Sequence, residues 1–126
     1  MKKYSLGLLF TLFIDINLSA QDSIVVFQEK AAMFSNEYVF YNNYSFKHYF
    51  ITDDGQIRYG VGTYKDLGCT RTLYFGEKDN NFNPRLHTIY ETNFKRRLHK
   101  RGKKFVSKDY YGTSRKLKVS FYQREN

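Results

Sequence analysis

Tryptophan is absent from this 126-residue chain, and proline and cysteine occur once each. A single cysteine cannot form an internal disulfide, so the class of small disulfide-stapled scaffolds is excluded. The longest apolar run, residues 6–14, is shorter than the roughly 20 residues that a membrane-spanning helix needs, which excludes a bundle of transmembrane helices. Acidic side chains are also scarce, with 12 Asp or Glu against 21 Lys or Arg, so the formal net charge is +9.

Phenylalanine and tyrosine are abundant, with twelve residues of each. Together with an apolar content of 41%, they make the chain too rich in core-forming side chains for a disordered protein, despite a mean hydropathy of -0.64. We therefore expect one compact domain.

The N-terminal segment has the order of a secretory signal peptide. Two lysines precede the apolar run, and Ser19 and Ala20 provide small residues before a polar stretch. We predict that residues 1–20 are a signal peptide cleaved after Ala20, and that residues 21–126 form a single β-rich domain that is secreted or periplasmic. An N-terminal membrane anchor is the alternative, but Asp15 interrupts the apolar segment, so we expect no transmembrane span in the mature chain.

Alternation of apolar and polar residues predicts β-strands along most of the chain. The clearest case is residues 44–50 followed by residues 57–63, which the turn signal Asp54-Gly55 should join into an antiparallel hairpin. The further predicted strands are residues 70–75, 104–110 and 115–122.

Residues 85–101 allow two interpretations. As a helix, their apolar residues recur at helical spacing, with Pro84 at the first helical position and Gly102 just past the end. As a strand, the same stretch alternates and is rich in Thr, Ile, Tyr and Phe, which favour pleated surfaces. We favour the strand, because a turn at residues 100–102 would then join two basic arms of similar length.

The predicted fold is therefore all-β, an antiparallel β-meander that forms a small barrel or a curved sheet. A short N-terminal helix is predicted at residues 28–34, with the apolar residues 31–34 facing the core. A helix at residues 85–100 would instead make the fold α+β.

Short motifs carry a resemblance to a protein family. They are Gly62-Thr63-Tyr64 after an alternating strand, the apolar strand Leu73-Tyr74-Phe75 and the terminal Tyr122-Gln123-Arg124. In these motifs the chain resembles small exported hypothetical proteins of Bacteroidetes-type bacteria, over residues 38–75 and the last strand. The resemblance implies an antiparallel β-meander with lipocalin-like features, and it implies no particular activity.

The strongest functional signal is a basic run, in which seven of the ten positions from Lys95 to Lys104 are Lys or Arg. Residues 21–84 carry six basic against eight acidic side chains, whereas residues 85–126 carry thirteen against three, so the two parts have charges of -2 and +10. Such a density of positive charge attracts polyanions. The predicted anion-binding residues are Arg96, Arg97, Lys100, Arg101, Lys103 and Lys104.

Outside the cytoplasm, the available polyanions are anionic lipid, lipopolysaccharide, acidic glycans and extracellular nucleic acid. We predict a non-enzymatic exported domain that binds one of these envelope or extracellular components through its basic C-terminal half. The alternative is that the basic run only keeps a hairpin soluble and its edge unpaired.

A second hypothesis is a lipocalin-like carrier that holds a small apolar ligand in an aromatic-lined interior. Its candidate ligand-binding residues are Phe46, His48, Phe50, Tyr59 and Tyr64. His48 lies on the same alternating face as Phe46 and Phe50, so we interpret it as a hydrogen-bonded interior histidine.

A third hypothesis is a small secreted hydrolase, nuclease or toxin that uses a histidine with Asp or Glu. The sequence has neither a nucleophile elbow nor the His or Cys spacing of a metal site, so we predict no catalytic residue, no cofactor and no tightly bound metal. Cys69, the only thiol, is interpreted as a small buried hydrophobe.

Overall fold

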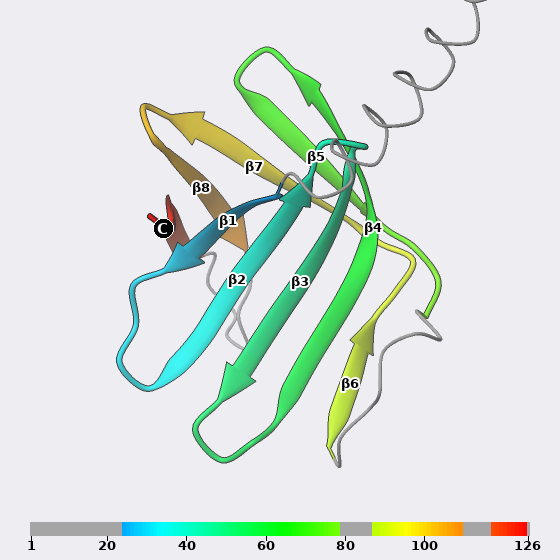
Figure 1. The fold of residues 1–126 in the computed structure, drawn as a ribbon, viewed down its shortest axis with the longest axis vertical. Coiled ribbons are helices and arrows are strands. Elements are labelled where there is room, and N and C mark those ends of the chain that lie inside the picture. Colours follow the sequence, from blue (N-terminus) through cyan, green and yellow to red (C-terminus); the bar gives the residue numbers. More distant parts are fainter. Residues whose placement is uncertain (1–23, 79–86, 110–116, 126) are drawn as a thin grey trace, which may run out of the picture.

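The computed structural model describes residues 24–78, 87–109 and 117–125 (Figure 1). The regular structure in these residues is entirely β-strand. The strands are β1 (Ile24–Glu29), β2 (Phe34–Tyr41), β3 (Ser45–Thr52), β4 (Ile57–Leu67), β5 (Thr70–Phe75), β6 (Thr88–Glu91), β7 (Lys95–Arg101), β8 (Lys104–Asp109) and β9 (Leu117–Gln123). The predicted signal peptide at residues 1–20 lies outside the described residues.

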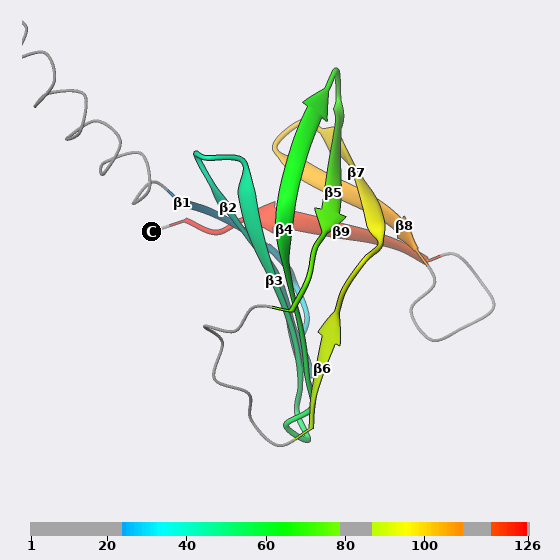
Figure 2. The same ribbon diagram turned by 90° about the vertical axis from the view of Figure 1, so that its right-hand side faces the viewer.

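Eight of the nine strands close into an antiparallel barrel. The order around it is β1-β2-β3-β4-β5-β7-β8-β9, and β9 pairs back with β1. Figure 1 shows β2, β3 and β4 side by side, and Figure 2 shows β7 and β8 on the other side of the barrel from β2 and β3. The predicted all-β fold with a small barrel is confirmed. Among the described residues, no helix is long and apolar enough to cross a membrane.

The hairpin predicted at Asp54-Gly55 is present as β3 and β4, in antiparallel register with Phe46 opposite Gly62. Gly55 has a φ of 88°, in the left-handed region that glycine enters without a steric penalty, and its N–H donates to the carbonyl of Thr52 at 3.1 Å. The predicted strands at residues 70–75, 104–110 and 115–122 correspond to β5, β8 and β9.

The described part of the ambiguous segment, residues 87–101, is strand, so the helix interpretation is wrong for these residues. The segment bends at residues 92–94, where Asn93 has a φ of 59°. Before the bend, β6 pairs in parallel with β4, and after it β7 pairs antiparallel with β5. Apolar alternation could not reveal the bend, because both halves follow the same period of two.

The helix predicted at residues 28–34 is also wrong. Gln28 and Glu29 end β1, Phe34 begins β2, and the residues between them form an exposed bend in which the Met33 side chain is 67% exposed. β1 and β2 pair antiparallel, so this stretch serves as the short connection between them rather than as a helix.

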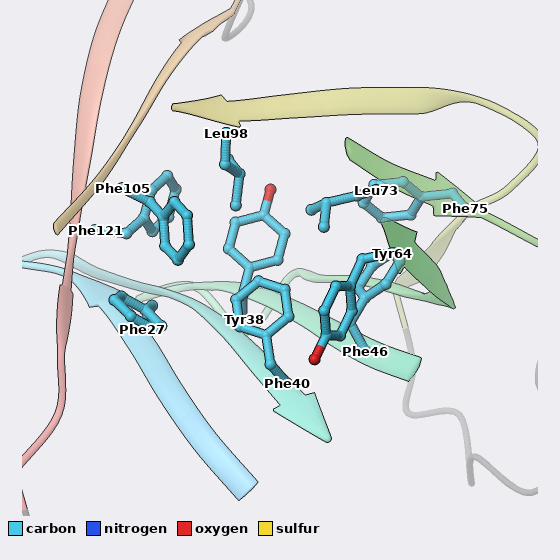
Figure 3. Close-up of a cluster of buried hydrophobic side chains, with 10 residues drawn as sticks. All are labelled: Phe27, Tyr38, Phe40, Phe46, Tyr64, Leu73, Phe75, Leu98, Phe105 and Phe121. Carbon is cyan, nitrogen blue, oxygen red and sulfur yellow. The ribbon is translucent and has the colours of Figure 1, made fainter. Parts of the chain in front are cut away.

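Aromatic rings fill the barrel and pack directly against one another (Figure 3). Phe27 lies edge-on to Phe105 with ring centroids 4.8 Å apart, and Phe46 lies edge-on to Phe75 at 4.9 Å. The buried cluster consists of Phe27, Tyr38, Phe40, Phe46, Tyr64, Leu73, Phe75, Leu98, Phe105 and Phe121.

Two glycines in β4 allow the rings and the neighbouring strand to approach this closely. A Cβ on Gly60 would lie 2.5 Å from Cδ2 of Phe75, and a Cβ on Gly62 would overlap the carbonyl oxygen of Tyr74. Close packing, rather than a ligand cradle, explains these glycines.

Cys69 is exposed, so the prediction of a buried thiol is wrong. It follows Gly68, which has a φ of 59°, in the tight turn between β4 and β5. The turn ends at the first paired residue of β5, so Cys69 has no inward position to occupy.

Candidate functional site

The alternation of β7 divides the basic run between two faces of the barrel wall. Leu98 is fully buried in the core, and Arg96, two positions before it, points to the same side. Arg97, His99 and Arg101 therefore lie on the outer face. Residues that are contiguous in the basic run are therefore divided in space, with Arg96 in the interior and Arg97, His99 and Arg101 on an outer basic face.

Arg96 is the predicted anion-binding residue that lies on the inner side. Its Nη1 donates to the hydroxyl of Tyr38 at 2.6 Å, and its Nη2 lies 3.7 Å from Oε2 of Glu91. Its guanidinium carbon is 5.4 Å from the centre of the Phe94 ring and 5.6 Å from that of Phe75. The side chain is only 13% exposed, so Arg96 is part of the interior and not of the outer basic face.

The outer faces of β7, β8 and β9 form a basic pocket of about 210 Å³. Strand register explains the convergence, because His99 pairs with Val106 across β7 and β8, and Lys108 pairs with Lys118 across β8 and β9. The pocket is lined by His99, Arg101, Val106, Lys108 and Lys118. Val106 is 4% exposed and forms an apolar floor between the cationic side chains.

No acidic residue occurs in β5, in β7, in residues 104–108 of β8 or in residues 118–123 of β9. The outward positions there are held by two threonines, two tyrosines, a serine and Val106 in addition to the basic residues and His99. Among the side chains that the structure describes, Nδ1 of His99 lies 3.2 Å from Oγ1 of Thr70, and Nη1 of Arg101 donates to the carbonyl of Lys100 at 3.5 Å. Among the side chains that the structure describes, no carboxylate pairs with the cations of the pocket.

Sequence reasoning found part of this surface. Arg97 and Arg101 lie on the outer face, while Lys100 and Lys103 are exposed at the β7–β8 hairpin end. Lys104 is half-buried beside Arg101. Lys108 and Lys118 are missing from the predicted set, and the antiparallel pairing of β8 with β9 brings them side by side.

The predicted ligand-binding residues do not all face one space. Phe46, His48 and Tyr64 are buried inside the barrel, and Phe50 is half-buried at one end of the same face. Tyr59 is buried too, but it is next to Gly60 along β4 and so points to the opposite face of the strand. It contacts Tyr49 and Tyr90 there, with ring centroids 5.1 and 6.2 Å away.

His48 is held inside the barrel through both ring nitrogens. Its Nδ1 lies 2.5 Å from Oε1 of Glu91, its Nε2 lies 2.8 Å from Oδ1 of Asn36, and its ring stacks on Tyr38 with centroids 4.2 Å apart. The prediction of a hydrogen-bonded interior histidine is confirmed. With only 2% of its surface exposed, His48 is not placed as a general base facing solvent.

Burial and charge shift the pKa of both members of this pair. Burial lowers the pKa of His48 below its ordinary value, and the hydrogen bond to Glu91 opposes that effect in part. For Glu91, burial alone would raise the pKa, but the hydrogen bond and charge of His48, with the charges of Arg96 and Arg58, outweigh it and lower the pKa. Glu91 is therefore ionised inside the barrel at neutral pH.

Arg71 closes the other end of the aromatic interior. Its guanidinium carbon lies 4.3 Å from the centre of the Tyr64 ring, 4.6 Å from that of Phe40 and 5.0 Å from that of Phe105. The same guanidinium donates to both carboxylate oxygens of Asp66, at 2.7 and 3.0 Å.

A second hollow, of about 340 Å³, lies on the outer face of β3 and β4. Its charged lining residues are Lys47 and Glu77, one of each sign, so it lacks the charge excess of the β7–β9 pocket. No group of three or more metal-ligating side chains occurs among the described residues.

Comparison of the chain with protein-family models, curated proteins and solved structures gives no match. Functional inference therefore rests on the geometry of the barrel and its basic face.

Proposed function

We propose that the chain is exported, cleaved after Ala20, and acts as a non-enzymatic protein that binds an anionic envelope or extracellular component. The observation that carries the proposal is the pocket on the outer face of β7–β9, where His99, Arg101, Lys108 and Lys118 converge. The resemblance to small exported proteins supports export and implies no particular activity.

The chemistry of the pocket favours phosphate or sulfate groups on a polymer or a surface. Arg101 supplies a planar fork for two oxygens, and Lys108 and Lys118 supply mobile point charges around it. Binding to a polyanion releases its condensed counterions, so affinity should fall steeply as salt rises. Anionic lipid, lipopolysaccharide, acidic glycan and extracellular nucleic acid all share this chemistry.

Retention on immobilised heparin tests the proposal. The triple variant Arg101→Glu, Lys108→Glu and Lys118→Glu should elute at much lower salt than the unmodified protein, because each charge reversal removes a contact and adds a repulsion. A matched control carries Lys47→Glu on β3, Lys65→Glu on β4 and Lys78→Glu after β5, which changes the net charge equally but lies outside β7–β9.

The control variant should keep most of the retention of the unmodified protein. Equal losses in the two triple variants would show that only net charge matters, and the proposed pocket would then have no role. Unchanged retention of the β7–β9 variant would refute the proposal outright.

A second candidate is a lipocalin-like carrier, because the fold is a β-barrel with an aromatic-rich interior. Phe46, His48 and Tyr64 line that interior, and half-buried Phe50 lies at one end of it. Native mass spectrometry of the protein purified from cells tests this role. An added mass that persists in salt and leaves on organic extraction would support a carrier, whereas the mass of the bare chain would count against it.

A further inference from the structure

Two hairpin ends adjoin at one end of the barrel (Figures 1 and 2). One is the β4–β5 turn with Leu67, Gly68 and Cys69, and the other is the β7–β8 turn around Gly102. The backbone N–H of Lys100 donates to the carbonyl of Cys69 at 2.6 Å, which joins the two ends.

The β4–β5 end projects beyond the barrel wall. Pairing of β4 with β3 ends at Thr63, whereas its pairing with β5 continues to Leu67 opposite Thr70. The Leu67 side chain is 85% exposed, more than any other exposed large apolar side chain among the described residues. A single exposed leucine is ordinary in a soluble protein, so its neighbours decide what it means.

Those neighbours are cationic. Lys100, Arg101 and Lys103 are all exposed at the adjoining β7–β8 end, and the basic pocket continues from Arg101 along the outer face. The nearby carboxylate of Asp66 is already bound in two contacts by Arg71. A protruding leucine therefore stands beside a cluster of exposed positive charge.

We propose that this double hairpin end docks on a bilayer that contains anionic lipid. Leu67 enters the interfacial region, while Lys100, Arg101 and Lys103 meet the lipid phosphates. The inference rests on the proposed function and selects lipid among its partners, because a soluble polyanion offers the leucine nothing to bury. Apolar burial and charge attraction add up in such docking, and each cation near an anionic surface contributes roughly fivefold in affinity.

A tryptophan reporter tests the proposal cleanly, because the chain has none of its own. The Leu67→Trp variant of the protein purified from cells is titrated with vesicles of phosphatidylglycerol and phosphatidylcholine. We expect a saturable blue shift of its emission and quenching by brominated acyl chains. The matched control is Met33→Trp. Met33 is 67% exposed in the connection between β1 and β2, at the other end of the barrel from Leu67, so the emission of this variant should not shift.

A second variant separates the two proposals. Leu67→Asp should lower affinity for anionic vesicles by roughly tenfold, since it removes apolar burial and adds a like charge to the lipid. Its retention on heparin should fall far less than that of the β7–β9 triple variant, because it adds one negative charge and removes no cation. Both variants alter an exposed turn position, and cooperative denaturation should confirm that they fold.

Vesicle binding without a shift in Leu67→Trp emission, or without an effect of Leu67→Asp, would overturn the leucine-led docking. Retention on heparin without binding to anionic vesicles would also overturn it and would point to a soluble polyanion, leaving the proposed function intact. If the unmodified protein neither is retained on heparin nor binds anionic vesicles, the proposed function itself is refuted.

Discussion

Inside the barrel, Nδ1 of His48 lies 2.5 Å from Oε1 of Glu91, although 43 positions separate the two residues in sequence. This contact links β3 to the extra strand β6, which pairs in parallel with β4. A buried hydrogen bond of this kind to an ionised carboxylate orients the groups around it, and removal of one partner leaves the other desolvated.

Glu91→Gln should destabilise the barrel by about 2 kcal/mol. The amide can still accept a hydrogen bond from His48, but it cannot balance the charge of Arg96. Urea denaturation at pH 7 measures the change. Glu77→Gln, at an exposed position, is the matched control and should change stability by less than about 0.5 kcal/mol. Equal stabilities of the two variants would contradict a structural role for the His48–Glu91 contact.

Stability should depend on pH through His48. Its pKa is lowered on folding from an ordinary value of 6.5, so the unfolded chain binds the proton more readily. The free energy of unfolding should therefore be at its full value above pH 6.5 and fall as the pH drops below it. The lowered pKa of Glu91 adds a further loss as the pH falls below its ordinary value of 4.5.

Denaturation curves of the unmodified protein and of His48→Gln, recorded between pH 7.5 and pH 5 at roughly half-unit steps, check this pH dependence. The variant should be less stable at neutral pH and should lack the loss that begins near pH 6.5. A parallel pH dependence in both proteins would assign the effect to other groups.

Gly62→Ala should cost about 3 kcal/mol, because its methyl group would overlap the carbonyl oxygen of Tyr74 and force β4 from β5. Gly55→Asn serves as the comparison. Gly55 has open space around it, and Asn tolerates a positive φ, so that change should cost about 1 kcal/mol or less. Thermal denaturation measures the loss of stability in both variants. Equal losses would contradict the packing argument.

Arg71→Lys should lose about 1 to 2 kcal/mol although the charge is kept. Lysine cannot stack a flat guanidinium on the Tyr64 and Phe105 rings or grip both oxygens of Asp66. The same exchange at exposed Arg97 should leave stability nearly unchanged, and chemical denaturation compares the two. If Arg71→Lys leaves stability as unchanged as Arg97→Lys does, the stacking contributes nothing to stability.

The thiol of Cys69 should react with an aromatic disulfide reagent in the native protein, because the residue is exposed in a turn. We expect one equivalent of labelling at the same rate with and without denaturant, followed by absorbance. Labelling that requires denaturant would show that the thiol is covered in solution.

Strands and the first hairpin could be predicted because period-two alternation and the Asp54-Gly55 turn are local signals. The partner of His48 could not be predicted, because Glu91 lies on β6, which precedes the bend at Asn93 and pairs in parallel with β4, and no local signal reveals that pairing. The failed helix at residues 28–34 shows the same limit, because barrel closure overrides a weak local preference for helix.

The basic site was visible in sequence only as a run of charge. Strand direction and register decide which residues share a face. As a result, Arg96 points into the barrel, whereas Lys118 lies opposite Lys108 on the neighbouring strand. Alternation along residues 95–101 could have separated the two faces once the segment was assigned to a strand.

Backbone amide shifts in a titration with inorganic diphosphate test the central claim most directly, since the probe carries only the phosphate chemistry that the partners share. We predict that the largest shifts in the ¹⁵N-labelled protein cluster at His99, Arg101, Lys108 and Lys118, and that added salt reverses them. Largest shifts around Lys47 on the opposite hollow, or no shifts at millimolar diphosphate, would contradict a phosphate-binding pocket on β7–β9.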